Sequence, residues 1–245
     1  MFKPCIIIPV YEHAEPLKAV LATLLAKGYA CVLVDDGSGP ACKEALQAMA
    51  AAGGGQVSLI RLEKNRGKGA AVKAGLRFAL DHGFTHGAQV DADGQHDLAA
   101  VDRLIEAARL EPLAVVGGQP VFDASAPGMR FYGRRLTNFW VHVNTLSRAI
   151  PDSMCGLRVY PLADTLAVID HCFCGDRMDF DTEILVRLHW AGLPLRFMPV
   201  AVHYPEGGSS HFRMGMDNVL ISFMHTRLFF GMLLRFPYLL WRKRA

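Results

Sequence analysis

Short apolar runs alternate with amphipathic segments along the first half of the chain. The runs are rich in Val, Ile, Leu and Ala, and they lie at residues 5–8, 31–34, 57–62, 88–91 and 113–116. Runs of this length predict buried strands of a parallel sheet. The segments between them have helical spacing and are bounded by Gly or Pro; they span residues 15–27, 40–52 and 97–110, and a further helix opens within 65–75. This alternation predicts an α/β fold with a mainly parallel sheet, flanked by helices and joined by right-handed crossovers.

The second half of the chain is less regular. Apolar spacing predicts a helix over residues 128–149 and another from 179 to about 191. Residues 157–160 are strand-like, and residues 195–202 form a strand or a strand pair. A loop with two glycines follows at 206–211, and glycines of this kind allow a loop to move.

The C-terminal stretch, residues 219–241, is rich in Leu, Phe and Met. His225, Arg227 and Arg235 interrupt it, so we expect no run of about 20 apolar residues that could span a bilayer. Its composition predicts an amphipathic helix in the membrane interface, with Arg242–Arg244 toward anionic lipid. The alternative is a core helix or a helix in a dimer interface.

Length and composition suit one globular domain of 245 residues. We expect a domain at 1–215, with a nucleotide-binding half at 1–118 and an acceptor half at 119–215, followed by a tail at 216–245. The net charge of +3 is too small to indicate nucleic-acid binding. Six irregularly spaced cysteines indicate free thiols, and the N-terminus has no signal-peptide pattern. These features predict a cytoplasmic protein.

Carboxylates follow two of the predicted strands, at the edge where open α/β sheets bind ligands. Asp36 follows the second strand, Asp91 ends the fourth, and Asp93 and Gln95 follow it. Two carboxylates and an amide oxygen are hard ligands of the kind that Mg²⁺ or Mn²⁺ prefers. The alternative is an ordinary turn, in which each Asp accepts a hydrogen bond from the backbone two residues on.

Glycines and basic residues open the helix near Lys68, where backbone amides and ammonium groups could bind phosphates. The Gly-x-Gly-x-x-Gly fingerprint is absent after the first strand, and the Gly-x-x-x-x-Gly-Lys-Ser/Thr loop is absent from the chain. Dehydrogenases and P-loop enzymes are therefore disfavoured.

An ordered set of short motifs runs along the chain: Pro9-Val-Tyr-Glu, Val34-Asp-Asp-Gly-Ser, Asn65-Arg-Gly-Lys-Gly, Asp91-Ala-Asp-Gly-Gln-His, the segment 152–158, Phe180-Asp-Thr-Glu and Gly208-Ser. In this order they resemble the family 2 inverting glycosyltransferases of GT-A fold, and most of all the dolichyl- and polyprenyl-phosphate mannosyl- and glucosyltransferase branch. The resemblance covers about residues 4–215. Two departures stand out: Glu12-His13 replaces a frequent Asn-Glu pair, and the chain ends without the paired transmembrane helices of some relatives.

The resemblance implies a role for each matching residue. Pro9, Tyr11 and Glu12 would line the nucleotide pocket, Asp36 would contact the base or ribose, and Lys68 would lie near the base and phosphate. Asp91, Asp93 and Gln95 would hold Mg²⁺ or Mn²⁺. Arg130 or Arg134, together with Arg158, would face the donor and acceptor phosphates. Glu183 would be the acidic residue of the acceptor side, and the loop with Ser209 and His211 would close over the diphosphate.

The chemistry of sugar transfer explains why these residue types are needed. Negative charge grows on the departing diphosphate, and a divalent ion stabilises it. Attack from the opposite face inverts the anomeric carbon. A phosphate acceptor is already an anion and needs only arginines to place it. A hydroxyl acceptor needs a base, for which Asp181 and Glu183 are candidates. The structural alternatives are an N-terminal helix acid for Glu183 and solvated helix positions for Arg130 and Arg134.

The leading hypothesis is therefore a metal-dependent inverting glycosyltransferase that uses a GDP- or UDP-linked sugar. Its expected acceptor is a lipid-linked phosphate or a lipid hydroxyl, with the enzyme peripheral at the cytoplasmic face of the cell membrane. One alternative is a sugar-nucleotidyltransferase, which normally has a Gly-rich first loop. Another is a nucleotide-sugar-binding relative without catalytic activity.

Overall fold

The computed structural model describes residues 1–122, 128–202 and 213–242, except for the side chains of residues 128–131 and 214. Arg130, Ser209 and His211, which were predicted as site residues, fall outside the described side chains. Their roles remain predictions.

Within the described residues, seven strands form one sheet in the order β3-β2-β1-β4-β6-β5-β7. The strands are β1 (Pro4–Val10), β2 (Cys31–Asp35), β3 (Val57–Arg61), β4 (His86–Gln89), β5 (Val115–Phe122), β6 (Arg158–Pro161) and β7 (Leu195–Val202). β6 is antiparallel to both of its neighbours, β4 and β5, and the other described pairs are parallel. The predicted mainly parallel sheet of an α/β fold is confirmed.

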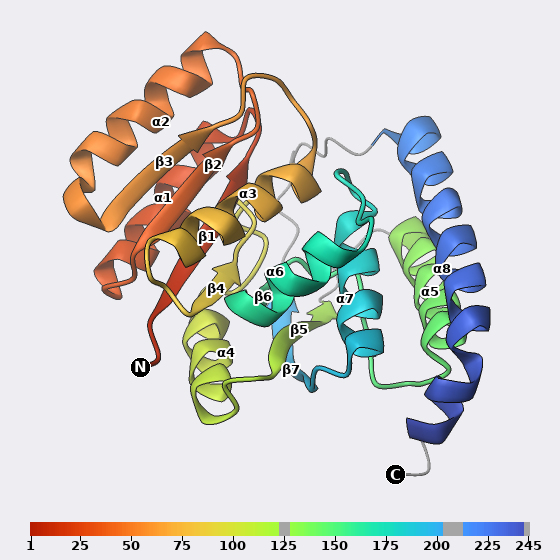
Figure 1. Ribbon diagram of the computed structural model, residues 1–245. Helices are drawn as coiled ribbons and strands as arrows, with labels where there is room; N and C mark the ends of the chain where they lie inside the picture. Colours follow the sequence, from red (N-terminus) through yellow and green to blue (C-terminus); the bar gives the residue numbers. More distant parts are fainter. Residues whose placement is uncertain (123–127, 203–212, 243–245) are drawn as a thin grey trace.

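Helices cover both faces of the sheet (Figure 1). They are α1 (Ala14–Ala26), α2 (Pro40–Ala52), α3 (Lys68–Asp81), α4 (Ala99–Leu110), α5 (Gly128–Thr145), α6 (Leu162–His171), α7 (Phe180–Ala191) and α8 (Met214–Arg242), with a short 3₁₀ turn at Gly54–Gln56. Helices α1, α2 and α4 bury apolar side chains against one face. Helices α3, α5, α6, α7 and α8 contribute to the core on the other face.

Several local predictions differ from the structure. Strand β5 spans Val115–Phe122, whereas the sequence predicted a strand over residues 113–116. Strand β4 ends at Gln89, so Asp91 lies two residues beyond the strand rather than at its last position. Helix α6 was not predicted, although Leu162, Thr165, Leu166 and Ile169 are buried at helical spacing. It was missed because it follows β6 without an intervening loop, so its first residues extend an apolar strand-like run.

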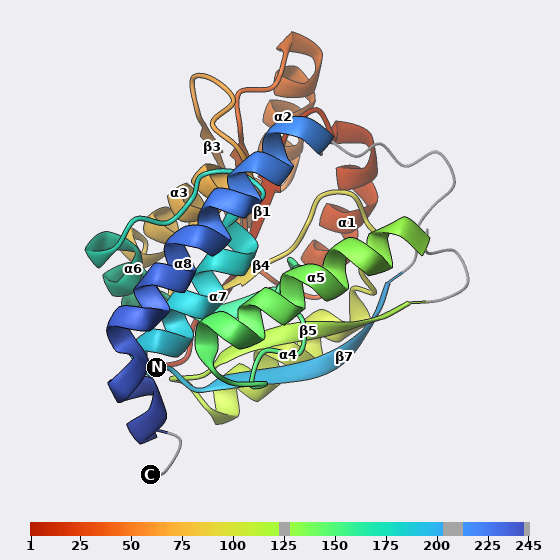
Figure 2. The same cartoon turned by 90° about the vertical axis from the view of Figure 1, so that its right-hand side faces the viewer.

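Helix α8 packs against α5 and α7 (Figure 2). Met224, Leu228, Met232 and Leu239 are buried in the core that these helices share. The segment Gly215–Arg242 is long and apolar enough, by length and composition alone, to cross a membrane, and 22% of its most apolar window is buried. As expected, the stretch contains no uninterrupted run of about 20 apolar residues; it meets this averaged criterion because single polar residues do not outweigh the apolar average. The division of the chain at residues 118 and 215 remains a prediction.

A buried carboxylate joins α8 to the rest of the fold. Glu183, on α7, has no exposed surface. Its Oε2 accepts hydrogen bonds from Arg227 of α8 at 2.5 Å and from the backbone N–H of Gly175 at 3.0 Å. Its Oε1 accepts a hydrogen bond from Arg187 at 2.9 Å. Because two arginines compensate one buried carboxylate, this residue holds α7, α8 and the segment before α7 together.

We expect the substitution Glu183→Gln to lower the free energy of unfolding by about 3 kcal/mol, because it leaves Arg187 and Arg227 without their counter-ion. Urea denaturation of the purified protein measures this change. The matched control is Glu106→Gln, which breaks an exposed ion pair with Arg109 and should hardly change stability. Equal, small effects of the two substitutions would contradict a structural role for Glu183.

Candidate functional site

A cavity of about 300 Å³ opens at the carboxyl ends of β1, β2 and β4, beside the start of α3. Pro9 and Tyr11 line it from the end of β1, Asp36 from the end of β2, and Lys68 from the first residue of α3. The structure thus brings together four of the residues that the sequence assigned to nucleotide binding. Their shared position follows from the parallel strands, which end at the same edge of the sheet.

Asp36 shapes the loop that leads into α3. It is 3% exposed and accepts hydrogen bonds from the backbone N–H groups of Arg66 and Gly67, both at 2.8 Å. Burial raises the pKa of Asp36, although these hydrogen bonds oppose the shift. Gly67 has a φ of 108°, and a Cβ there would lie 2.6 Å from the Cγ atom of Arg177. This position therefore requires glycine.

Glu12, the remaining residue predicted for the nucleotide pocket, does not line the cavity. Its Oε1 accepts a hydrogen bond from the backbone N–H of Gly39 at 2.6 Å, and its own N–H donates to Ser38 Oγ at 3.1 Å. Glu12 has a φ of 56°, in the left-handed region that few residues other than glycine adopt. Through these contacts Glu12 connects the loop that follows β1 to the loop that follows β2.

Asp91, Asp93 and Gln95 lie together on a wall shared by two cavities. They line the larger cavity and also a second one of about 160 Å³. Asp93 Oδ1 accepts a hydrogen bond from the N–H of Gln95 at 3.1 Å, so the turn considered as an alternative does form. It coexists with the cavity position, because this bond uses one lone pair of Asp93. Burial and the charge of Asp91 raise the pKa of Asp93.

The donor set of this wall suits a hard divalent cation. Two carboxylate side chains and one amide side chain line both cavities, and oxygen ligands of these kinds fit Mg²⁺ or Mn²⁺. Within the described part of the chain, no group of three or more His, Cys, Asp or Glu side chains could hold a metal ion. A cation here would therefore depend on the Gln95 amide and on ligand oxygens to complete its coordination.

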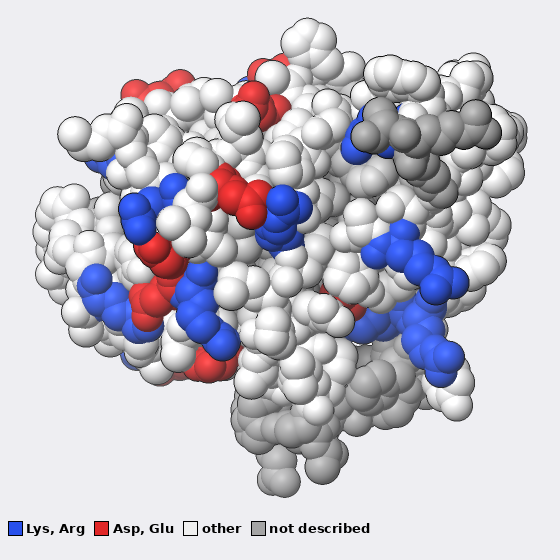
Figure 3. Space-filling model, turned by 90° about the horizontal axis from the view of Figure 1, so that it is seen from below, with Lys and Arg blue, Asp and Glu red and all other residues white. Residues whose placement is uncertain are grey.

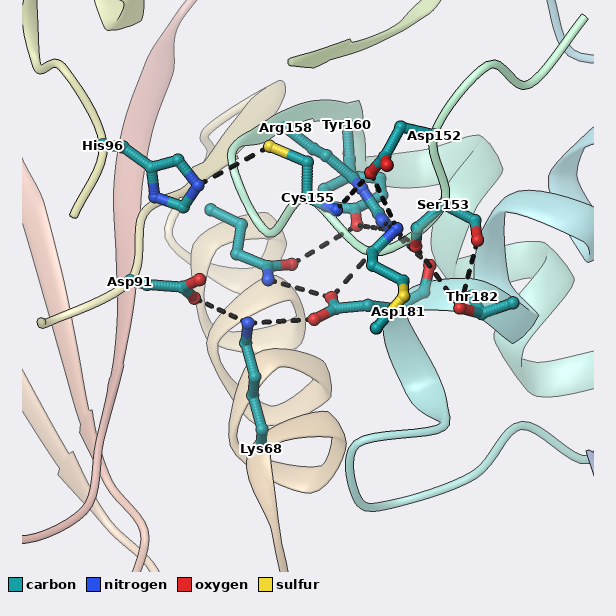
Figure 4. Close-up of polar contacts among 12 residues, drawn as sticks. Lys68, Asp91, His96, Asp152, Ser153, Cys155, Arg158, Tyr160, Asp181 and Thr182 are labelled. Carbon is teal, nitrogen blue, oxygen red and sulfur yellow. Dashed lines mark hydrogen bonds and ion pairs between the residues drawn. The ribbon is translucent and has the colours of Figure 1, made fainter. Parts of the chain in front are cut away.

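Lys68 forms ion pairs with two carboxylates, that of Asp91 on this wall and that of Asp181 on α7 (Figure 4). Its Nζ lies 2.7 Å from Asp91 Oδ1 and 2.9 Å from Asp181 Oδ2. Burial opposes the charged form of Lys68, but Asp181 and Asp91 outweigh it and raise the pKa of Lys68. Burial likewise opposes ionisation of Asp91, but Lys68 holds the pKa of Asp91 below its usual range. A Cβ on Gly156 would lie 2.4 Å from Asp91 Oδ2, so glycine permits this close packing.

Asp181 and Arg158 lie behind the cavities rather than in them. Asp181 Oδ1 accepts a hydrogen bond from the side chain of Gln89 at 3.0 Å. Arg158 is 1% exposed and donates hydrogen bonds to the backbone oxygens of Ser153, at 2.6 Å, and of Asp181. Neither of the two cavities is lined by Asp181, Arg158 or Glu183. The structure therefore does not bring these three residues to the open part of the site.

Arg134 is the described arginine of α5 that does reach the site. It lines the second cavity, lies 2.6 Å from Asp152 Oδ2, and stacks over the Phe122 ring at 4.9 Å. Asp152 Oδ1 also accepts hydrogen bonds from the N–H groups of Met154 and Cys155. Asp152 thereby fixes both the arginine and the turn that forms the far side of this cavity.

The residues of the larger cavity that were not predicted include three charged ones: Arg177, Arg213 and Asp217. Arg177 lies in the segment between α6 and α7, and its guanidinium is 3.5 Å from Asn65 Oδ1. Arg213 and Asp217 lie at the start of α8, where Asp217 Oδ2 accepts the Arg213 N–H at 2.7 Å. None follows a predicted strand, so only the tertiary fold brings these residues to the cavity.

The second cavity also contains a histidine and a cysteine in contact. His96 Nε2 lies 3.6 Å from Cys155 Sγ. Burial disfavours the charged imidazole, but Cys155, Asp91 and Asp93 outweigh burial and raise the pKa of His96 to about 9. His96 follows Gln95 directly, so the same turn supplies side chains to both cavities.

Comparison with known proteins shows the family of this chain. The family model described as glycosyl transferase family 2 matches residues 5–162. The dolichyl-phosphate beta-glucosyltransferase of Dictyostelium discoideum is 26% identical, with 90% of this chain and 74% of that protein covered. The undecaprenyl-phosphate 4-deoxy-4-formamido-L-arabinose transferase of Edwardsiella ictaluri is 32% identical over 68% of this chain, and this chain spans about half (51%) of its length.

A solved structure shows the same fold at low identity. It is the glucosyl-3-phosphoglycerate synthase of Mycobacterium tuberculosis, in complex with Mn²⁺, UDP and glucosyl-3-phosphoglycerate. The TM-score is 0.64 at 11% identity, with 95% of this chain and 79% of that chain covered.

Proposed function

The chain belongs to glycosyl transferase family 2, and on this premise we propose that it transfers a sugar, with inversion, from a nucleoside diphosphate to a lipid-linked phosphate. The observation that carries the proposal is the wall formed by Asp91, Asp93 and Gln95, which faces both cavities. A donor in one cavity and an acceptor in the other would meet at this wall. Family membership disfavours the sugar-nucleotidyltransferase alternative.

The larger cavity is suited to the nucleoside diphosphate. It combines an aromatic ring, Tyr11, with carboxylates and with two arginines, Arg177 and Arg213. Most small-molecule sites combine apolar walls with a few polar groups in this way. The related fold of the synthase holds UDP and Mn²⁺ together, which supports a nucleotide and a divalent cation in the same region here.

Asp91, Asp93 and Gln95 would hold the divalent cation, Mg²⁺ or Mn²⁺. Such a cation stabilises the negative charge that develops on the departing diphosphate. Asp93 presents its carboxylate on a turn fixed by the Gln95 N–H, so the ligand geometry exists before any substrate binds.

The second cavity favours an anionic acceptor. Arg134 lies on its wall, and arginine binds phosphate oxygens in a fixed geometry. The two candidate bases are both occupied: Asp181 pairs with Lys68, and Glu183 pairs with Arg187 and Arg227. A phosphate acceptor requires no base, so it fits the site better than a hydroxyl does. The names of the two transferase relatives, dolichyl-phosphate and undecaprenyl-phosphate, support the same choice.

The lipid part of the acceptor implies contact with a membrane, and α5 and α8 offer an apolar surface. Exposed large apolar side chains on these two packed helices are Tyr132, Leu136, Phe139, Trp140, Met216, Val219, Phe223, Phe230, Leu233, Leu234, Phe236, Tyr238, Leu240 and Trp241. We name this set the α5–α8 face. Asp217 is the single acidic residue of α8, and it is buried.

Charge is unevenly distributed near this face. On the face seen from below, most of the visible Asp and Glu side chains lie on the left, among Lys and Arg side chains and away from α5 and α8 (Figure 3). On the right, Lys and Arg side chains stand in an otherwise uncharged surface. An apolar face with basic neighbours is typical of proteins that bind anionic lipid surfaces. We therefore infer peripheral attachment at the cytoplasmic face of the membrane.

The donor and metal assignments are tested by thermal shift with UDP and GDP, each with and without Mn²⁺. We expect one of the two nucleotides to raise the melting temperature only when Mn²⁺ is present, because Asp91, Asp93 and Gln95 would hold a cation that offsets the negative charge of the diphosphate. Asp93→Ala should abolish this stabilisation and reduce sugar transfer to undecaprenyl phosphate by at least about 100-fold.

The matched control is Asp97→Ala. Asp97 is exposed, lines neither cavity, and bonds only to the nearby Ala99 N–H among the side-chain contacts described for it. The nucleotide with Mn²⁺ should raise the melting temperature of Asp97→Ala by as much as that of the unmodified protein. The proposed function would be overturned if the nucleotide stabilised the protein equally with and without Mn²⁺, or if Asp93→Ala transferred sugar at the rate of the unmodified protein.

Membrane attachment is tested with Phe230→Glu and Leu234→Glu, one helical turn apart on the α5–α8 face. We expect each to weaken binding to phosphatidylglycerol vesicles by on the order of tenfold, because an apolar side chain leaves the bilayer surface. Co-sedimentation measures the binding. The control Leu110→Glu changes an exposed leucine on α4, and its vesicle binding should be unchanged. Undiminished binding by the α8 variants, or their conversion from dimer to monomer, would contradict attachment through this face.

A further inference from the structure

Lys68 lines the larger cavity and also contacts the wall formed by Asp91, Asp93 and Gln95. Its ammonium group is shared between Asp91, on that wall, and Asp181, behind it. The proposed reaction assigns no step to this lysine or to Asp181. Both residues are nevertheless largely buried, and burying charge is costly unless it has a purpose or a partner.

The charges around Lys68 balance without a metal. Lys68 and Arg158 are positive, Asp91 and Asp181 are negative, and Lys68 contacts both carboxylates directly. Asp93 adds one further negative charge at the edge of the cavities. With Asp93 included, these five groups carry one net negative charge, so a divalent cation would leave one positive charge in excess. A diphosphate would remove that excess.

We propose that Lys68 is an internal counter-ion that competes with the divalent cation for Asp91, so that tight metal binding requires the nucleoside diphosphate. Asp91 Oδ1 is buried and pairs with the ammonium group of Lys68. This ion pair reduces the negative charge that Asp91 offers to a cation at the cavity. The inference rests on the proposed placement of the cation at Asp91 and Asp93. It assigns Lys68 a positioning role that controls the order in which metal and donor bind.

Asp181 has the opposite effect in this arrangement. Its carboxylate holds Lys68 from the side away from the cavities, at 2.9 Å, and is itself fixed by the Gln89 amide. When Asp91 turns to the metal, Asp181 keeps the ammonium group compensated. Removing the charge of Asp181 would leave Asp91 as the only carboxylate contacting Lys68 in this cluster. The lysine would then compete with the metal more strongly.

The two substitutions Lys68→Met and Asp181→Asn therefore have opposite expected effects on one measurable quantity. Isothermal calorimetry with Mn²⁺ alone, without nucleotide, gives the dissociation constant. We expect Lys68→Met to lower it and Asp181→Asn to raise it, each by on the order of tenfold, because a charge is removed within contact distance of a ligand. If Lys68 and Asp181 merely held the fold, both substitutions would weaken binding.

The control is Lys73→Met, the same substitution one and a half turns along α3. Lys73 pairs with Asp176 at 2.7 Å and lines neither cavity, so its Mn²⁺ affinity should match the unmodified protein. A second readout is the factor by which the bound nucleotide, UDP or GDP, strengthens Mn²⁺ binding. That factor should shrink in Lys68→Met, because the metal no longer needs the diphosphate to overcome the lysine.

The possible outcomes separate this inference from the proposed function. If Asp93→Ala leaves Mn²⁺ binding intact, the metal is elsewhere and the proposed function fails with it. If Asp93→Ala abolishes binding but Lys68→Met weakens it or leaves it unchanged, only the counter-ion role is overturned. If Lys68→Met does not fold, Asp181→Asn decides: unchanged or tighter Mn²⁺ binding overturns the inference.

Discussion

The ion pair between Lys68 and Asp91 is the contact on which the rest of the site depends. It joins the first residue of α3 to the turn after β4, and through Asp181 it reaches the start of α7. These three elements come from separate parts of the chain. Lys68 and Asp91 line the larger cavity, and Asp181 supports Lys68 from behind it. A buried carboxylate without a cation nearby would either be protonated or destabilise the fold. Compensation by a lysine keeps Asp91 ionised and fixed before any ligand arrives.

The antiparallel strand β6 explains why two cavities share one wall. Gln89, the last residue of β4, pairs with Arg158, the first residue of β6. Because β6 runs against its neighbours, the segment before it arrives at the edge where the parallel strands end. That segment supplies Cys155 and Gly156 to the second cavity, and Asp152, which anchors Arg134. A parallel strand in this place would bring its preceding segment to the opposite edge, and Asp91 would face a single cavity.

The sequence predicted the parts of the site that depend on local order. Asp36, Asp91 and Asp93 each follow a strand, and parallel strands must end together, so their convergence could be inferred from the pattern alone. The fold class was predictable for the same reason. Element ends were less certain, as the shift of β4 shows, because the polar residues that end a strand do not fix its last hydrogen bond.

Contacts between distant segments could not be predicted. Asp181 and Glu183 are two residues apart on α7, so their side chains leave the helix in different directions. One meets Lys68 beside the cavities, and the other meets Arg227 of α8 in the core. The motif identifies both as acidic residues near a helix start but does not give the direction of either. Arg177 and Asp217 line the larger cavity from segments outside residues 5–162, the part that the family model matches.

Helix α8 contributes to the larger cavity, to the core and to the exposed apolar surface, and these contributions constrain its position. Its first turn supplies Asp217 to the larger cavity, its middle supplies Arg227 to Glu183, and its outer side forms much of the α5–α8 face. The ion pair between Arg227 and the buried Glu183 holds the helix in the domain, because separating them would leave the Glu183 carboxylate with one arginine fewer in the core. A helix that is apolar enough to enter a bilayer is thereby held against the protein. Its outer side remains exposed, while its start remains at the larger cavity.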